Sequence, residues 1–307
     1  MTNSYELAIN FLADGSNFLK SQLQSMGYSV DETKSPEDIS LKYFNLLKRL
    51  IPPFPRQVLV SKNFSCPPGY EKGLEIISNK IKNGEDLRPH LSKGIKDLDY
   101  KDILLNDWGI YHLHLGTTLD SSGFITRTKP VLFARFDKER AFFIDIMEHG
   151  KGVPLPWIKQ HLIRILHDNW PDSINIFRLD GIQKLTYIPS DTDIKDFRQA
   201  GIQTGVQLEE GVVYLPLGGG YDSSGRSTDA KIQSNCWIRS LENWEKYVRD
   251  NYLLLVEQAK HDDITFGSKL KFSLMIDDLQ VYALEEGSRV AWKICDSWFP
   301  MPWLSGY

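Results

Sequence analysis

Apolar positions recur at helical spacing in the first part of the chain and then change to strand-like runs. Residues 5–28 and residues 35–53 space their apolar side chains at helical intervals and predict two helices. The run 56–62 predicts a strand, and residues 67–84 predict a helix that ends at Gly84, a residue suited to a left-handed cap. The pattern favours a helical N-terminal segment followed by a mixed body.

The central part of the sequence is rich in β-forming residues. The runs 123–137 and 140–150 predict an antiparallel hairpin with its turn near residues 137–140. Because Pro130 has no backbone N–H, we expect it at a strand start, an edge or a bulge. Residues 155–171 carry apolar side chains on one helical face and predict an amphipathic helix.

The last third of the chain contains apolar patterns typical of both helices and strands. Its predicted elements are strands over 173–179 and 183–189, a capped helix over 190–201, a strand leading into a flexible glycine loop over 209–231, a helix over 240–260 and two strands within 269–294. The fold class is therefore α+β: N-terminal helices, a central twisted antiparallel sheet and a C-terminal mixed α/β unit. The predicted domains are a helical segment 1–55, a central α+β domain 56–172 and a C-terminal α+β domain 173–307.

Composition narrows the classes of function. With 307 residues, 41% of them hydrophobic, the chain can bury a sizeable core. A formal net charge of -4 excludes a globally basic nucleic-acid coat, so a polyanion has to bind at a local site. No apolar run has the length of a membrane span and no signal peptide is recognisable, so we expect a cytoplasmic protein without a membrane partner.

Three cysteines, Cys66, Cys236 and Cys295, lie far apart without CxxC spacing. This spacing argues against a zinc ribbon, a redox motif or a disulfide scaffold, and we expect buried thiols.

The stretch DWGIYHLHLG, residues 107–116, carries the most informative candidate chemistry. Side chains alternate between the faces of a strand, so His112 and His114 share one face and Tyr111, Leu113 and Leu115 share the other. The apolar face is expected to anchor the strand, which leaves the imidazoles to meet solvent, substrate or metal.

The predicted hairpin supplies two partners for these histidines, Arg127 and His149. Metal-independent RNA cleavage needs a base for the 2'-hydroxyl, an acid for the leaving oxygen and a cation for the phosphorane. We expect His114 and His149 to carry protons, Arg127 to clamp the phosphate and His112 to support them. No metal or other cofactor is needed for this chemistry.

Further donors are candidates for binding phosphate or nucleic acid. Thr128 and Arg135 lie on the hairpin, and Arg226 and Ser227 lie in the glycine loop, where backbone N–H groups are able to approach an anion. The loop has neither the lysine nor the spacing of a Walker A motif.

The order of helices, then residues 107–116, then the runs 123–136 and beyond, resembles the sheet of RelE-like toxins. These belong to a wider class of small ribonucleases grouped with barnase, EndoU and the colicin nucleases. The resemblance covers about residues 70–170 and implies RNA cleavage by a toxin or antiviral defence protein of the toxin-antitoxin type, with an inhibitory protein partner. By position, Arg127 lies on the family's basic strand, and His149 matches a histidine near the end of the sheet in some members. The chain is longer and more acidic than these toxins.

Two other interpretations remain open. His112, His114 and His149 are able to present imidazoles to zinc or another divalent ion in a metal-dependent hydrolase, although no companion motif such as HExxH is present. A protein-binding or nucleic-acid-binding module without chemistry is the other, because the aromatic tail 296–307 is suited either to a partner surface or to internal packing.

Overall fold

The structure, a computed structural model, describes residues 5–149, 156–209, 211–261 and 263–298 and confirms the α+β class. Contacts group the described residues into two compact units, one formed by residues 5–44 and 231–298 and the other by residues within 45–230. This grouping differs from the three predicted domains because the first unit combines an N-terminal and a C-terminal segment. None of the described helices is long and apolar enough to cross a membrane.

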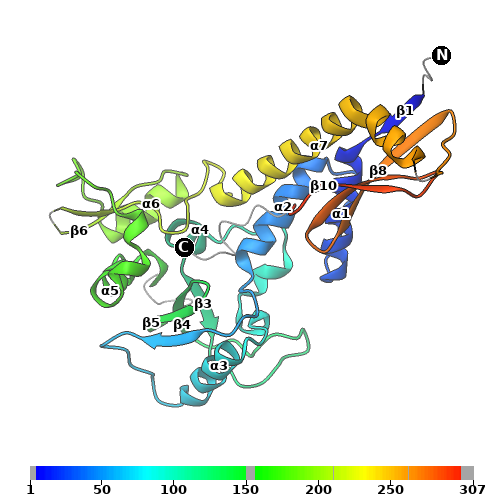
Figure 1. Ribbon diagram of the computed structural model, residues 1–307. Helices are drawn as coiled ribbons and strands as arrows, with labels where there is room; N and C mark the ends of the chain where they lie inside the picture. The colour runs from blue at the N-terminus through cyan, green and yellow to red at the C-terminus, as the bar shows by residue number, and fades with distance from the viewer. Residues whose placement is uncertain (1–4, 150–155, 210, 262, 299–307) are drawn as a thin grey trace. The chain divides into compact units, whose positions relative to one another are not determined.

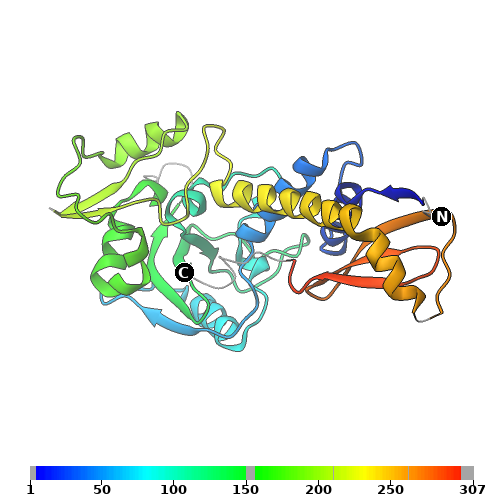
Figure 2. The ribbon, with the colours of Figure 1, turned by 45° about the horizontal axis from the view of Figure 1, so that its top comes forward.

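The first unit contains a four-stranded sheet in the order β1-β8-β9-β10, with α7 and the start of α1 packed on one face (Figure 2). Phe11 and Val248 meet Leu270 and Phe272 in its core, while Lys271 points to solvent, as expected for a sheet with one buried face. The elements are β1 Glu6–Ile9, α1 Phe11–Ser25, α7 Thr228–Lys260, β8 Lys269–Asp277, β9 Gln280–Glu285 and β10 Ala291–Cys295, and α2 Pro36–Arg49 begins in this unit.

Several predictions for this unit were wrong in their detail. Residues 6–9 form a strand parallel to β8, and the Asn10 side chain accepts a hydrogen bond from Ala13 N–H, so the helix begins only at Phe11. Helix α7 begins at Thr228 instead of residue 240, and the C-terminal strands number three instead of two.

Part of the aromatic tail packs internally, because Trp298 lies against the rings of Phe18 and Trp237. Residues 299–307 lie outside the described part of the chain. The expected burial of the three cysteines was also wrong: Cys66 and Cys295 are half-buried and Cys236 is exposed, all as free thiols.

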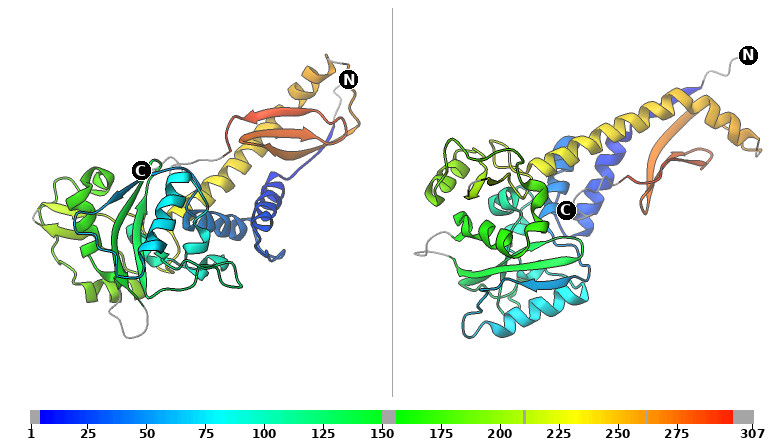
Figure 3. Two further views of the ribbon diagram at one scale, coloured as in Figure 1. Left: turned by 90° about the horizontal axis from the view of Figure 1, so that it is seen from below. Right: turned by 60° about the vertical axis from the view of Figure 1, so that its left-hand side comes forward.

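The second unit is built on a sheet in the order β2-β5-β4-β3, with α3 on one face and α5 on the other (Figures 1 and 3). A separate two-stranded sheet pairs β6 with β7. The elements are β2 Gln57–Val60, α3 Glu71–Asn83, α4 Ile103–Trp108, β3 Tyr111–His114, β4 Pro130–Phe136, β5 Arg140–Glu148, α5 His161–Asn169, α6 Asp191–Gln199, β6 Val206–Glu209 and β7 Val212–Tyr214.

Predictions in this unit were confirmed where they depend on hydrogen bonds between residues that are close in sequence. Gly84 caps α3 with φ of 70°, and a capping box at Ser190 starts α6. In the hairpin between β4 and β5, Asp137 accepts hydrogen bonds from the turn amides, and Pro130 is the first residue of β4.

The two strands predicted over 173–189 were wrong. Residues Asn175–Phe177 form a 3-10 helix, and Arg178 joins Tyr214 in a single bridge. Farther along, the backbone N–H of Leu185 donates to the Gln207 side chain instead of to a neighbouring strand, so no ladder extends there.

The sheet register decides what surrounds the HxH pair. His112 lies opposite Phe133 on β4, and His114 lies opposite Val131. Since directly opposite residues in antiparallel strands share a face, both histidines are on the side where Phe133 and Val131 pack against Leu162 of α5. His114 is fully buried on this face, so the expected open face was wrong for His114, whereas His112 is only partly covered.

Candidate histidine site

Three histidines predicted to converge are brought together at one end of the sheet. His112 and His114 come from β3, the edge strand, and His149 follows directly after β5. The ring centroid of His149 lies 5.2 Å from that of His114 and 6.3 Å from that of His112, and the His112 and His114 centroids are 6.3 Å apart. The rings form a triangle, although 35 residues separate His114 from His149.

His149 is held by the backbone of the adjoining segment. Its backbone N–H donates to Lys129 O, and its Nδ1 lies 2.9 Å from the same oxygen. Since a carbonyl only accepts, Nδ1 carries a proton, and Nε2 has no hydrogen-bond partner among the described residues. The ring stands edge-on to Trp157 with centroids 6.1 Å apart. A fixed Nδ1–H with an unpaired Nε2 is the arrangement that a proton-transferring histidine requires.

His114 is fully buried and has a different character. Its Nδ1 accepts a hydrogen bond from Thr128 N–H at 3.3 Å, so Nε2 carries the proton, and this buried atom has no partner. Burial, followed by the positive charge of Arg127, lowers the pKa of His114 to about 2. The imidazole is neutral near pH 7 and is suited to packing against the other two rings, not to carrying a proton.

His112 is only partly covered, and its two ring nitrogens make no hydrogen bond to the described residues. Burial lowers its pKa, the Asp102 carboxylate opposes this shift, and the charges of His149 and Arg127 add to the lowering. A neutral His112 with unpaired nitrogens is a candidate base.

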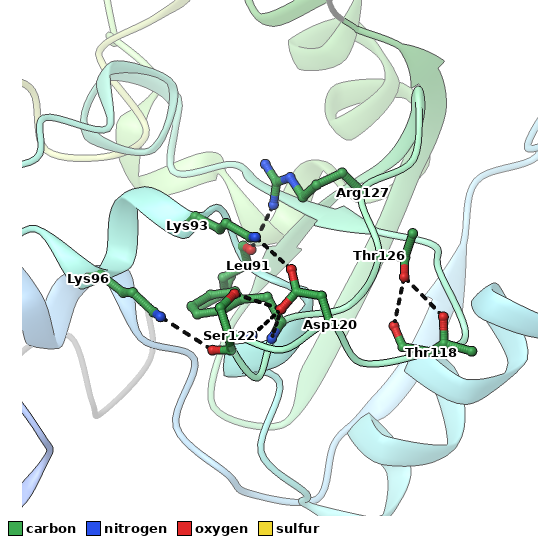
Figure 4. A network of polar contacts seen from close by, with 9 residues as sticks. Leu91, Lys93, Lys96, Thr118, Asp120, Ser122, Thr126 and Arg127 are labelled. Carbon is green, nitrogen blue, oxygen red and sulfur yellow. Dashed lines mark hydrogen bonds and ion pairs between the residues drawn. The ribbon is translucent and has the colours of Figure 1, made fainter.

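Arg127 lies on the loop before β4, and its charge acts on both His112 and His114. One guanidinium nitrogen, Nη1, donates to Leu91 O at 3.1 Å (Figure 4). Lys93 in the facing segment pairs with Asp120 at 2.6 Å, and Lys96 donates to Ser122 O. These bonds tie the Arg127 loop to the segment 91–96 and bring two lysines to the same side of the molecule.

Thr128 and Arg135 are occupied by the protein itself. The Thr128 hydroxyl accepts from Leu115 N–H and donates to Pro130 O, so it secures β3 against β4. Arg135 is 5% exposed, donates to Leu217 O and lies over the ring of Phe177. Both serve packing in this structure, and their predicted contact with phosphate is not supported by their surroundings.

The glycine loop is packed, and the expectation of a flexible loop was wrong. Gly218 N–H donates to Asp107 O and Gly220 N–H donates to Asn106 O, so the loop amides are consumed by the end of α4. A Cβ at Gly218 would lie 2.0 Å from Leu105 O, which explains the glycine. Ser227 is buried and caps α7 by accepting from Ala230 N–H, whereas Arg226 is exposed.

Sequence reasoning missed three neighbours of the histidines. His90 is fully buried and its Nδ1 bonds to His114 O at 2.9 Å; burial lowers its pKa against the effect of that bond. Asp102 and Tyr100 share a small cavity with His112. The available signal was Asp102 as the cap of the short helix α4, which the prediction treated as a polar connection.

The metal interpretation has no ready site in the described part of the chain, where no group of three or more His, Cys, Asp or Glu side chains is arranged to hold an ion. The set His112, His114 and His149 therefore stays a prediction as a zinc site. Comparisons of the chain with protein-family models, with curated proteins and with solved structures gave no match.

Proposed function

We propose that this protein cleaves RNA without a metal ion, by acid–base catalysis at the histidine triangle. The observation that carries the proposal is the convergence of three imidazole rings from β3 and the end of β5, with centroids 5.2 to 6.3 Å apart, beside the charge of Arg127. Imidazoles transfer protons near neutral pH, and a guanidinium matches the geometry of a phosphate.

The geometry changes the roles expected from the sequence. His112 is the base that removes the 2'-hydroxyl proton, and the resulting oxygen attacks phosphorus. His149, as an imidazolium that keeps its Nδ1–H on Lys129 O, donates its Nε2 proton to the departing 5'-oxygen, and the products are a 2',3'-cyclic phosphate and a 5'-hydroxyl. His114, held neutral by burial, packs against both rings, and Arg127 offsets the charge of the phosphorane.

The test is cleavage of an end-labelled, mixed-sequence RNA by the full chain in the presence of EDTA. His112→Ala and His149→Ala are each expected to reduce the rate by about 10² to 10⁴, the usual contribution of a general acid or base. His261→Ala is the matched control, because His261 is an exposed histidine at the end of α7. Mass analysis of the products should show the cyclic phosphate.

Three results would count against the proposal. RNA left intact by the full chain contradicts it directly, and RNA that is bound but not cut favours the binding module. Cleavage that EDTA abolishes and one specific metal restores favours the metal-dependent hydrolase.

A further inference from the structure

Asp102 lies at the same cavity as His112 and has no part in the proposed proton transfers. One carboxylate oxygen, Oδ1, accepts from Leu105 N–H at 3.1 Å and caps α4. The second oxygen, Oδ2, has no hydrogen-bond partner among the described residues. An N-cap uses a single oxygen, so the cap accounts for only half of this carboxylate.

Asp102 and His112 line the same cavity of about 20 Å³, which is large enough for one water molecule and too small for a substrate. The polar side chains around it come from several separate parts of the chain. They are Arg49, Ser92, Tyr100, Asp102, Tyr111 and His112.

Three other polar groups at the cavity form hydrogen bonds with the backbone, and one of them is Ser92 Oγ, which accepts from Gly94 N–H. The Arg49 guanidinium donates to Gly94 O and Asp97 O, and the Tyr111 hydroxyl donates to Lys48 O. Burial raises the pKa of Tyr100, with the Asp102 charge adding to this shift, so its phenol stays neutral. Asp102 is thus the anion that faces His112, while Arg127 and His149 act on the ring as cations.

We propose that Asp102 is a positioning residue for His112, holding one nitrogen of the imidazole through a single water in this cavity. The carboxylate then fixes the tautomer and rotation of the ring, and the opposite nitrogen faces the triangle. The structural pairing stands independently of RNA cleavage, whereas its consequence for catalysis rests on the proposed function.

The test is a histidine NMR titration of the full chain labelled at imidazole Cε1 and nitrogen, with His112→Gln assigning the signal. Asp102→Asn removes the charge and keeps an N-cap residue. The negative charge opposes the lowering by burial, so its loss is expected to lower the pKa of His112 further. The tautomer signature in the nitrogen spectrum at neutral pH is expected to change as well.

Asp120→Asn is the matched control, because Asp120 is a carboxylate near Arg127 that does not line the cavity. It should leave both His112 signals unchanged. Identical titration and tautomer in Asp102→Asn and the unmodified chain would overturn the pairing. Absence of RNA cleavage, with the NMR change present, would overturn only the proposed function.

Discussion

The second unit contains two candidate sites that were predicted from residue types alone, the histidine triangle and the glycine loop. The polar atoms of the two sites differ in whether the protein itself already uses them. At the histidine triangle, Nε2 of His149 and both ring nitrogens of His112 make no hydrogen bond to the described residues. At the glycine loop, Gly218 and Gly220 donate their amides to the end of α4, and Ser227 caps a helix. The histidine triangle therefore has polar atoms available for a ligand, whereas the polar atoms of the glycine loop stabilise the loop.

The comparison shows that a suitable residue type is not enough for binding: the polar atoms must also be free of partners inside the protein. Glycines beside arginine and serine are compatible with phosphate binding, but an amide already paired inside the protein gains little by exchanging its partner. The histidine triangle differs, because Nε2 of His114 is buried without a partner, which is unfavourable and calls for an explanation, while the unpaired nitrogens of the partly covered His112 and His149 are not used by the protein. Unpaired atoms therefore distinguish the two regions better than the motifs do.

The largest effect of one substitution at neutral pH is expected from Gly218→Ala, which should destabilise the loop region by about 3 kcal/mol. A Cβ would lie 2.0 Å from Leu105 O and 2.6 Å from Asn106 O, and backbone atoms cannot rotate away. Gly267→Ala is the control, since Gly267 is exposed and its nearest atom would be 3.9 Å away. Urea unfolding measures the free energy of unfolding of both variants. Equal values would show that the loop backbone moves to accommodate the added methyl group.

Acid is expected to destabilise the folded chain through His114. The pKa of His114 is about 2 in the folded chain against 6.5 for the free side chain, so only the unfolded state gains this proton between those values. Stability is full above pH 6.5 and falls as the pH drops, with about 1.4 kcal/mol lost per pH unit for this one group. His90 and His112, whose pKa values are also lowered, add to the slope.

His114→Asn keeps an acceptor for Thr128 N–H and removes the titration. The dependence of the unfolding free energy on pH, measured from pH 7 to pH 4, should become less steep by about 1.4 kcal/mol per unit. His161→Asn, at an exposed position, is the comparison variant. An unchanged slope in His114→Asn would mean that His114 takes up its proton in the folded state.

Local signals in the sequence predicted much of this fold, and the misses have a common cause. Gly84, Ser190 and Asp137 each act through hydrogen bonds to nearby residues, which a short window of sequence contains. Strand β1 pairs with β8 more than 260 residues away, so no local pattern marks it. Its apolar residues, followed by the helix of Phe11–Ser25, have the appearance of one continuous helix.

The sequence was enough to predict which histidines come together, but not how deeply each of them is buried. Strand alternation and the hairpin register were enough to bring His112, His114 and His149 together. The burial of His114 depends on α5 covering that face, and the sequence does not show which face a helix covers. Asp102 escaped notice because the helix that it caps, α4, has only six residues and was taken for part of a polar connection.

The smallest effects are expected for Arg127 and Arg226, each substituted in the His149→Ala variant. RNA binding can be measured in this variant without interference from cleavage. Arg127→Ala should reduce the slope of log affinity against log salt by about 0.7, the value for one phosphate contact on a single strand, and Arg127→Lys should retain the slope. Arg226→Ala should leave the slope unchanged, because the loop amides beside Arg226 are already paired and cannot cradle a phosphate with it. If Arg226→Ala flattened the slope as much as Arg127→Ala, an exposed charge alone would be enough for RNA contact, and unpaired atoms would no longer separate the two regions.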